Sequence, residues 1–375
     1  MKTTNSSVLR ELFEKSQAVL VKKQKVRAVE QVALLARQSD DFNLAAQIYH
    51  ELFKTGNAIE DIRSALLGLG SMRGLYDQLP ESVNLKELFA CYVKTLVFFP
   101  GYLRLTRGQI LGLLSEAENL SRKIGNSAKV SLYLKSAAMW GLGEIPSARQ
   151  LTRRWYEQPY VKGDFPCLPC MKRNIISLQI FYDWEHLEEP FREAKAFNRL
   201  NPVCEDYYYE VKAEYAFSLP LLKRERAEES REHREVEIFY EQKKEAVFSG
   251  RENISDAAAL LRILALTKLR KKSADEAVRI IENYAKKALK TQNSYRVFSF
   301  YQTAWLYFHK RYKNTTKELK MHLPKEFSVN NEKGVYKCKA LENWFRQEAL
   351  QQAERIDKRN QNNYFTKHML GKGSK

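Results

Sequence analysis

The sequence predicts an all-α protein, and three observations lead to that fold class. Apolar side chains recur at helical spacing through most of the 375 residues. Alternating apolar and polar runs between turn residues, which indicate strands, are scarce, and only 15 Gly and 10 Pro occur. Apolar residues make up 44% of the chain, which is enough for a packed core. Sandwich, barrel and doubly wound folds are therefore disfavoured.

Four segments share one pattern, in which a helix with an apolar stripe, a short polar turn and a second helix with a small residue near its start follow one another. The clearest is residues 29–52, where the turn Ser39–Phe42 precedes Ala45 and Tyr49. Three looser copies span residues 132–159, 175–202 and 261–289. Turns are expected at residues 143–145 in the second copy and 271–274 in the fourth. Since each helix pair buries only one side of each helix, pairs of this kind must stack on one another.

This pattern resembles the tetratricopeptide repeat (TPR), with irregular spacing between the copies. The resemblance implies an α-solenoid that binds a protein or peptide partner through the first helix of each pair. Carried over residue by residue, the partner-binding positions are Arg27, Glu30, Arg37, Tyr133, Trp140, Lys172, Gln179, Tyr182 and Arg262. A protein of paired helices without a true repeat is the alternative. Either interpretation predicts a helical fold.

Nearly all of the net charge of +18 lies in the last third of the chain. Residues 251–375 hold 27 Lys and Arg against 12 Asp and Glu, whereas residues 1–250 hold 36 against 33. The expected basic surface consists of Lys268, Arg270, Lys271, Lys272, Lys286, Lys287, Lys290, Lys310, Arg311 and Lys313. Such a tract attracts phosphates, anionic lipid or an acidic protein face. A scaffold that binds RNA or single-stranded DNA through this third is therefore the alternative to one that binds a protein or peptide.

An aromatic-rich helix is expected within the basic third. Five of its aromatic residues recur at spacings of three and four, which is typical of a core stripe: Phe298, Tyr301, Trp305, Phe308 and Tyr312. Phe300 and Tyr307 lie off this stripe. They are expected at the surface, where aromatic rings can stack on unpaired bases.

Three regions are expected along the chain. They are a helical array over residues 1–250, basic helical repeats with a capping helix over 251–357, and a flexible tail over 358–375. Gly250 is the main boundary signal, and glycines indicate turns between Gly68 and Pro80. Residues 313–331 are expected to form a poorly packed loop, and residues 335–356 the final amphipathic helix.

The motifs of several enzyme classes are missing from the sequence. No phosphate-binding glycine loop, dinucleotide-binding fingerprint, zinc-protease motif or nucleophile elbow occurs. The six histidines are scattered. A binding protein without enzymatic activity or cofactor is therefore expected. No segment reaches the roughly 20 apolar residues of a membrane span, and the N-terminus lacks a secretory signal, so a cytoplasmic location is expected.

Cysteine usage agrees with a cytoplasmic location, because five cysteines in a long chain do not form a secreted disulfide framework. Cys167 and Cys170 have the spacing of metal ligands or of a redox pair. A structural zinc site takes four ligands, and only Cys204 and His186 lie nearby in the sequence. The pair is therefore expected to lie in a proline-containing loop between helix pairs, without a metal.

Overall fold

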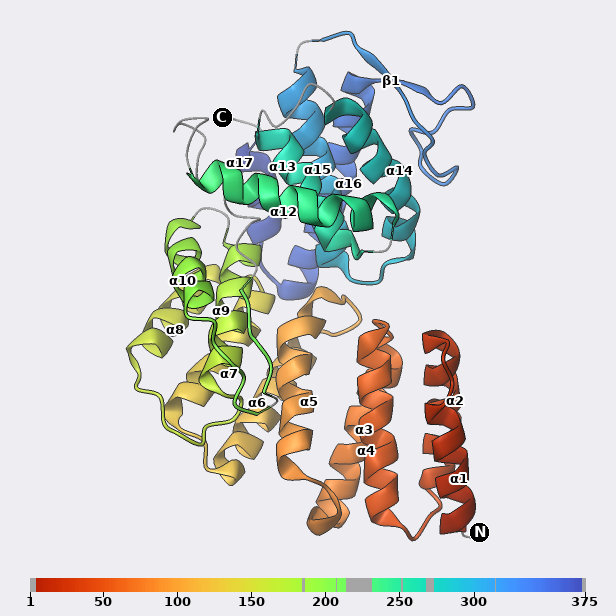
Figure 1. Ribbon diagram of the computed structural model, residues 1–375, viewed down its shortest axis with the longest axis vertical. Coiled ribbons are helices and arrows are strands. Elements are labelled where there is room, and N and C mark those ends of the chain that lie inside the picture. The colour runs from red at the N-terminus through yellow and green to blue at the C-terminus, as the bar shows by residue number, and fades with distance from the viewer. Residues whose placement is uncertain are drawn as a thin grey trace. The chain divides into compact units, whose positions relative to one another are not determined.

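The computed structural model describes residues 5–183, 186–206, 208–213, 231–250, 252–267, 273–313 and 315–372. In these residues helices form almost all of the regular structure, which confirms the all-α fold class (Figure 1). The chain divides into two compact units. The first comprises residues 1–100, 108–135 and 157–166, and the second comprises residues 101–107, 136–156 and 167–375. The expected boundary at Gly250 therefore lies inside the second unit.

The first unit is built from successive helices that each pack on the next. They are α1 (Ser6–Gln17), α2 (Lys22–Ala36), α3 (Phe42–Ala58), α4 (Ile62–Gln78), α5 (Leu85–Phe98), most of α6 (Arg107–Ile124) and the first half of α7 (Ala128–Gly141). From α1 to α5, each helix contacts the following helix, and α2 also contacts α4 (Figure 1). Single 3₁₀ turns at Pro80–Ser82 and Phe99–Gly101 flank α5.

Short polar side chains fix the starts of four of these helices, and the first is Asn5, which accepts a hydrogen bond from the Ser7 amide at the start of α1. The Asp41 carboxylate accepts a hydrogen bond from the Leu44 amide at 3.0 Å, and Asp61 and Asn84 cap α4 and α5 in the same way. Each cap satisfies an amide that has no partner within its helix. The predicted turn Ser39–Phe42 is confirmed, since α2 ends at Ala36 and α3 begins at Phe42.

The glycines between Gly68 and Pro80 do not form the expected turns, because α4 runs through them to Gln78. Gly68 is required by the close crossing of α3 and α4. A Cβ atom at Gly68 would lie 2.6 Å from both the Phe53 amide nitrogen and the Tyr49 carbonyl oxygen. Here glycine allows two helix backbones to approach, and Ala45 beside them is 2% exposed, as its predicted place at a helix crossing requires.

The second unit has α15 at its centre. Its helices are α8 (Ile145–Glu157), α9 (Leu168–Tyr182), α10 (Glu188–Arg199), α12 (Arg231–Phe248), α13 (Ile254–Leu266), α14 (Ser273–Lys290), α15 (Ser294–Tyr312), α16 (Cys338–Asn360) and α17 (Tyr364–Lys372), together with the second half of α7. Both α13 and α16 pack extensively on α15. Because this helix is enclosed on more than one side, Phe300 and Tyr307 are buried, as are all residues of the predicted stripe except the half-buried Tyr312. The expectation that Phe300 and Tyr307 lie at the surface is wrong.

The C-terminal region is more ordered than the sequence indicates. The expected tail from residue 358 instead completes α16 and forms α17, in which Phe365 and Met369 are buried. Residues 335–337 form strand β2 (Val335–Lys337), which pairs antiparallel with β1 (Glu318–Lys320), Glu318 opposite Lys337. The segment before β2 is not poorly packed, since it buries Met321 and Phe327.

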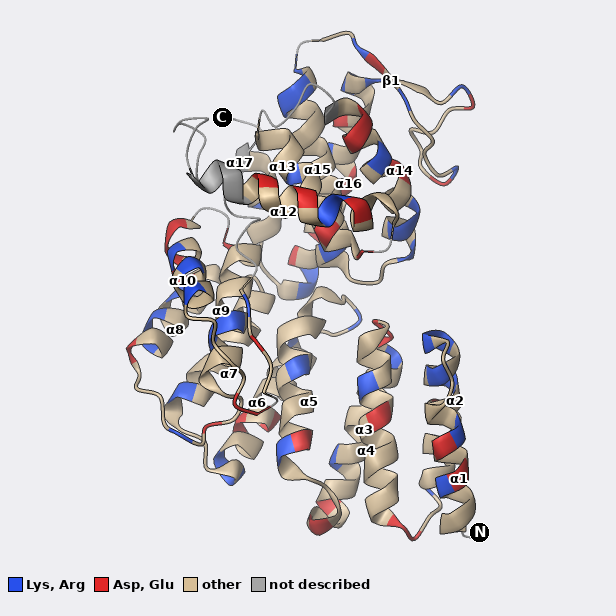
Figure 2. Ribbon diagram, in the orientation of Figure 1, with Lys and Arg blue, Asp and Glu red and all other residues tan. Residues whose placement is uncertain are grey.

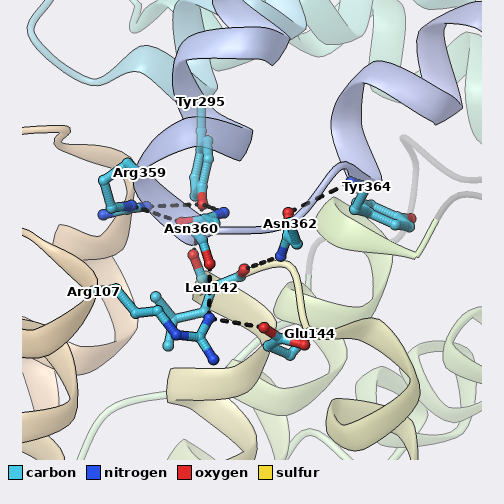
Figure 3. Close-up of polar contacts among 9 residues, drawn as sticks. Arg107, Leu142, Glu144, Tyr295, Arg359, Asn360, Asn362 and Tyr364 are labelled. Atoms are coloured by element: carbon cyan, nitrogen blue, oxygen red, sulfur yellow. Dashed lines mark hydrogen bonds and ion pairs between the residues drawn. The ribbon is translucent and has the colours of Figure 1, made fainter.

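A polar junction joins four segments of the second unit that are distant in the sequence (Figure 3). The Tyr295 hydroxyl donates to the Gly141 carbonyl at 2.6 Å and accepts from Arg359 and Asn360, both at 3.0 Å. Arg107 donates to the Glu144 carboxylate at 2.7 Å and to the Asn360 carbonyl at 2.8 Å. We call these contacts the Tyr295 junction. They hold the end of α16 against the turn between α7 and α8, which lies at residues 142–144, close to its predicted position.

No helix among the described residues is both long enough and apolar enough to span a membrane.

Candidate partner-binding groove

A groove of about 440 Å³ lies on the first unit, between α2, α3 and α4. Its α2 and α3 side is formed by Ala36, Arg37, Ser39, Phe42, Ala45 and Tyr49, and its α4 side by Leu66, Leu67, Gly70, Ser71, Gly74, Leu75 and Gln78. We call it the α2–α4 groove. Most of these residues are small or apolar, and the Phe42 ring at the rim is 40% exposed. The groove can therefore accept an apolar surface.

Two glycines of α4 leave the groove open. No neighbouring heavy atom lies within 4 Å of the position that a Cβ atom would take at Gly70 or at Gly74. The two residues are four apart and so lie on one face of the helix. Glycine in a helix interior costs about 1 kcal/mol relative to alanine. Unlike Gly68, neither glycine is required by a neighbouring backbone, so the packing of the first unit does not explain them.

Arg37 places a positive charge at the edge of the groove. Its side chain is exposed, and no carboxylate of the described part of the chain forms an ion pair with it. Burial raises the pKa of the Tyr49 hydroxyl in the groove wall, and the nearby Arg37 charge opposes that shift. Tyr49 is therefore neutral near pH 7, and Arg37 is the charged side chain of the groove.

The other two predicted positions on α2 lie on the same helix face as Arg37, as helical periodicity requires. Arg27 is exposed, and Glu30 is half-buried with an oxygen 3.8 Å from a guanidinium nitrogen of Arg63 on α4. A long ion pair of this kind contributes little to stability. These three positions lie along one side of α2, with the exposed Leu34 between Glu30 and Arg37. Their role in partner binding stays a prediction.

The remaining predicted partner-binding side chains do not form an exposed face. Tyr133, Trp140 and Tyr182 are buried, and the Trp140 indole donates to the Thr152 hydroxyl at 3.0 Å. Gln179 and Arg262 are also buried, and burial lowers the pKa of Arg262 to about 10. Lys172 is half-buried and pairs with Glu193 at 3.1 Å. Tyr133 belongs to the first unit and the other five to the second, and none of the six is exposed, because the helices that carry them are covered on the faces where the resemblance placed a ligand.

The predicted basic surface is only partly available for binding. Lys268, Arg270, Lys271 and Lys272 lie outside the described residues. Lys287 donates to the backbone carbonyls of residues 250 and 252, and Arg311 donates to those of residues 264 and 267 at the end of α13. Lys286, Lys290, Lys310 and Lys313 are exposed. Figure 2 shows both basic and acidic residues along the described part of α12, which precedes the predicted basic third in the sequence.

Sequence reasoning missed Phe42, Gly70 and Gly74 as groove residues. Phe42 was assigned to a turn, and the two glycines fell in a stretch taken as a turn. The i, i+4 spacing of Gly70 and Gly74 is the signal that could have identified them, because two glycines on one helix face allow close approach of another backbone.

Comparison with models of known protein families, with curated protein sequences and with solved structures finds no match.

Proposed function

We propose that the first unit is a scaffold whose α2–α4 groove binds a helical, acidic segment of a protein partner. The observation that carries this proposal is the pair of uncrowded glycines at positions 70 and 74. Packing within the first unit does not account for these two glycines, although each costs the helix about 1 kcal/mol relative to alanine. Close approach of a partner backbone would account for both glycines, because they lie at the open groove.

The groove favours a helix over an extended strand as the bound segment. A strand partner normally pairs with an unpaired sheet edge, and the groove is walled by helices. A partner helix can place its apolar stripe against Leu67 and Phe42 while its backbone crosses α4 at the two glycines. This mode requires small side chains on the receiving helix, as the groove provides.

The arginines beside the groove indicate the charge of the partner. Arg37 and Arg27 are exposed on the α2 edge, and neither is neutralised by a carboxylate in the described residues. Acidic side chains beside the apolar stripe of the partner would complement both arginines. We expect these contacts to direct orientation and association rate more than affinity.

The order of the helices supports the same proposal. Under this interpretation α2 and α4 are the first helices of successive TPR-like pairs, and α3 is the second helix between them. Their contacts follow that order, since α2 contacts α3 and α4, and α3 contacts α4. The partner would then bind on the side where first helices line a solenoid.

Nucleic-acid binding by the basic third remains the second candidate. It is supported by the exposed Lys286, Lys290 and Lys313. Two of the predicted basic residues, Lys287 and Arg311, are instead used to hold backbone carbonyls. We therefore favour a protein partner, with no catalytic step.

Peptide selection tests the proposal directly. Peptides selected from a random display library on the wild-type protein should carry Asp or Glu beside an apolar stripe. Arg37→Glu should raise the Kd of a selected peptide about tenfold, which corresponds to about 1.4 kcal/mol. The difference from the wild type should become smaller at high salt. Arg153→Glu, which changes an exposed arginine on α8 outside the groove, is the matched control. Selected peptides that bind Arg37→Glu and wild type equally would contradict the proposal, and salt-sensitive RNA binding without peptide binding would favour the second candidate.

A further inference from the structure

Three cysteines that are dispersed in the sequence meet in the second unit. The Sγ atoms of Cys167, Cys170 and Cys204 all lie within 4.8 Å of one another. The Cys204 sulfur is 3.6 Å from that of Cys167 and 3.4 Å from that of Cys170. No disulfide joins them. We call this group the thiol cluster.

Two different local structures bring the sulfurs together. Cys167 is the N-cap of α9 and Cys170 lies in its first turn, so the pair begins a helix and does not lie in the expected loop. Cys204 lies in a tight hairpin, where its amide donates to the Tyr209 carbonyl at 2.8 Å and the Val211 amide donates to the Pro202 carbonyl at 2.9 Å. The hairpin packs against α9 and α10 through a small apolar core that includes Ile176, Phe197 and Val211.

The sulfur separations match those around one tetrahedral metal ion. Zinc–sulfur bonds of about 2.3 Å at tetrahedral angles place ligand sulfurs about 3.8 Å apart. The two shortest separations, 3.4 and 3.6 Å, are close to that value and far from a disulfide bond of about 2.05 Å. Three thiols at such distances gain little from one another as weak hydrogen-bond partners.

The surroundings of the cluster suit thiolate ligands. The partial positive charge at the start of α9 favours anionic sulfur at Cys167 and Cys170. Cys167 and Cys204 are buried, whereas Cys170 is half-buried, so one side of the cluster opens to solvent next to Tyr209.

We propose that Cys167, Cys170 and Cys204 bind one zinc ion, with an exchangeable water at the fourth position on the side of Cys170. Binding releases the protons of the three thiols to solvent and changes no oxidation state. The ion links Cys204 and its hairpin to the start of α9, beside the small apolar core there. His186 is not a ligand, since its ring nitrogen faces Arg149 and Asp183. This inference is independent of the α2–α4 groove.

Metal analysis of the full chain, purified under reducing conditions without added metal, tests the proposal. We expect about one zinc per wild-type chain. Cys204→Ser and Cys170→Ser should each lose most of it, whereas Cys338→Ser, which removes a buried thiol outside the cluster, should retain it. Chelation should lower the melting temperature of the wild type, and zinc should restore it.

Cobalt(II) provides a second readout that does not depend on how the variants fold. Added to chelator-treated wild-type protein, it should give the sulfur-to-metal charge-transfer absorption and the strong visible bands of a tetrahedral thiolate site. Wild-type protein without zinc and without these bands would overturn the proposal. So would copper in place of zinc, or a disulfide between two of the three cysteines in the reduced preparation.

Discussion

The α2–α4 groove of the first unit and the Tyr295 junction of the second both place arginines beside helix ends, but they differ in what the arginines contact. In the junction, Arg107 and Arg359 donate to Glu144, to the Tyr295 hydroxyl and to backbone carbonyls (Figure 3). In the groove, Arg37 is exposed beside small residues. Arginines whose donors are satisfied within the chain hold the fold, whereas an exposed one at an open groove is available to a partner.

Two glycines of α4 show the same contrast between residues used within the fold and residues left open. A Cβ atom at Gly68 would lie 2.6 Å from the backbone of α3, and one at Gly70, two residues further along, would meet no neighbouring atom within 4 Å. The first glycine therefore serves the fold, and our account assigns the second to binding. The following predictions test this division from the largest expected effect to the smallest.

Gly68→Ala should lower the free energy of unfolding by about 2–4 kcal/mol. Its Cβ atom would collide with the backbone of Phe53 and Tyr49, which cannot move without separating α3 from α4. Denaturant unfolding followed by circular dichroism measures the loss. Alanine at the open position of Gly112 on α6 is the control and should cause no loss.

Tyr295→Phe should lower the free energy of unfolding by about 1–3 kcal/mol. The change keeps the ring and removes only the hydroxyl, which leaves the Gly141 carbonyl without its donor and Asn360 without an acceptor in a buried place. The same removal at Tyr208, which is 86% exposed, should have no measurable effect. Equal stability of Tyr295→Phe and wild type would show that the junction does not hold the second unit.

Replacement of Glu342 on α16 should have a smaller effect on stability, and this effect should depend on pH. Burial alone would raise the pKa of Glu342, but hydrogen bonds from His309 and Lys339 outweigh it and hold that pKa below its usual value. Because the folded pKa is the lower one, the stabilisation is complete above the unfolded pKa and is lost as the pH falls through the folded pKa. Glu342→Gln should therefore flatten the loss of stability below about pH 4.5. Acid unfolding curves check this, with exposed Glu332→Gln as a variant that should follow the wild type.

Much of the helical architecture followed from local sequence. The turn at Ser39–Phe42 could be predicted because Ser39 and Asp41 are residues that end one helix and cap the next. The burial of Ala45 followed from its place in the helix stripe. These features depend on neighbours a few residues away, which the sequence shows.

The candidate sites depend on contacts between distant residues, which local sequence does not show. The same residue type closes a crossing at Gly68 and opens a groove at Gly70, according to whether another helix lies opposite. The spacing of Phe300 predicts a surface position, but α13 and α16 pack on its helix and the side chain is buried. Cys204 joins Cys170 across 34 residues, and only the hairpin that carries it brings the sulfurs together.

The measurement that tests the central claim most directly pairs stability with peptide affinity in one variant, Gly70→Ala/Gly74→Ala. Alanine fits both positions and favours the helix, so the free energy of unfolding should rise by about 1–2 kcal/mol. The same two methyl groups fill the floor of the α2–α4 groove, so the Kd for a library-selected acidic peptide should rise about tenfold or more. Gly112→Ala should also stabilise the protein but leave the Kd unchanged. A more stable double variant that binds the peptide as tightly as the wild type would contradict the account.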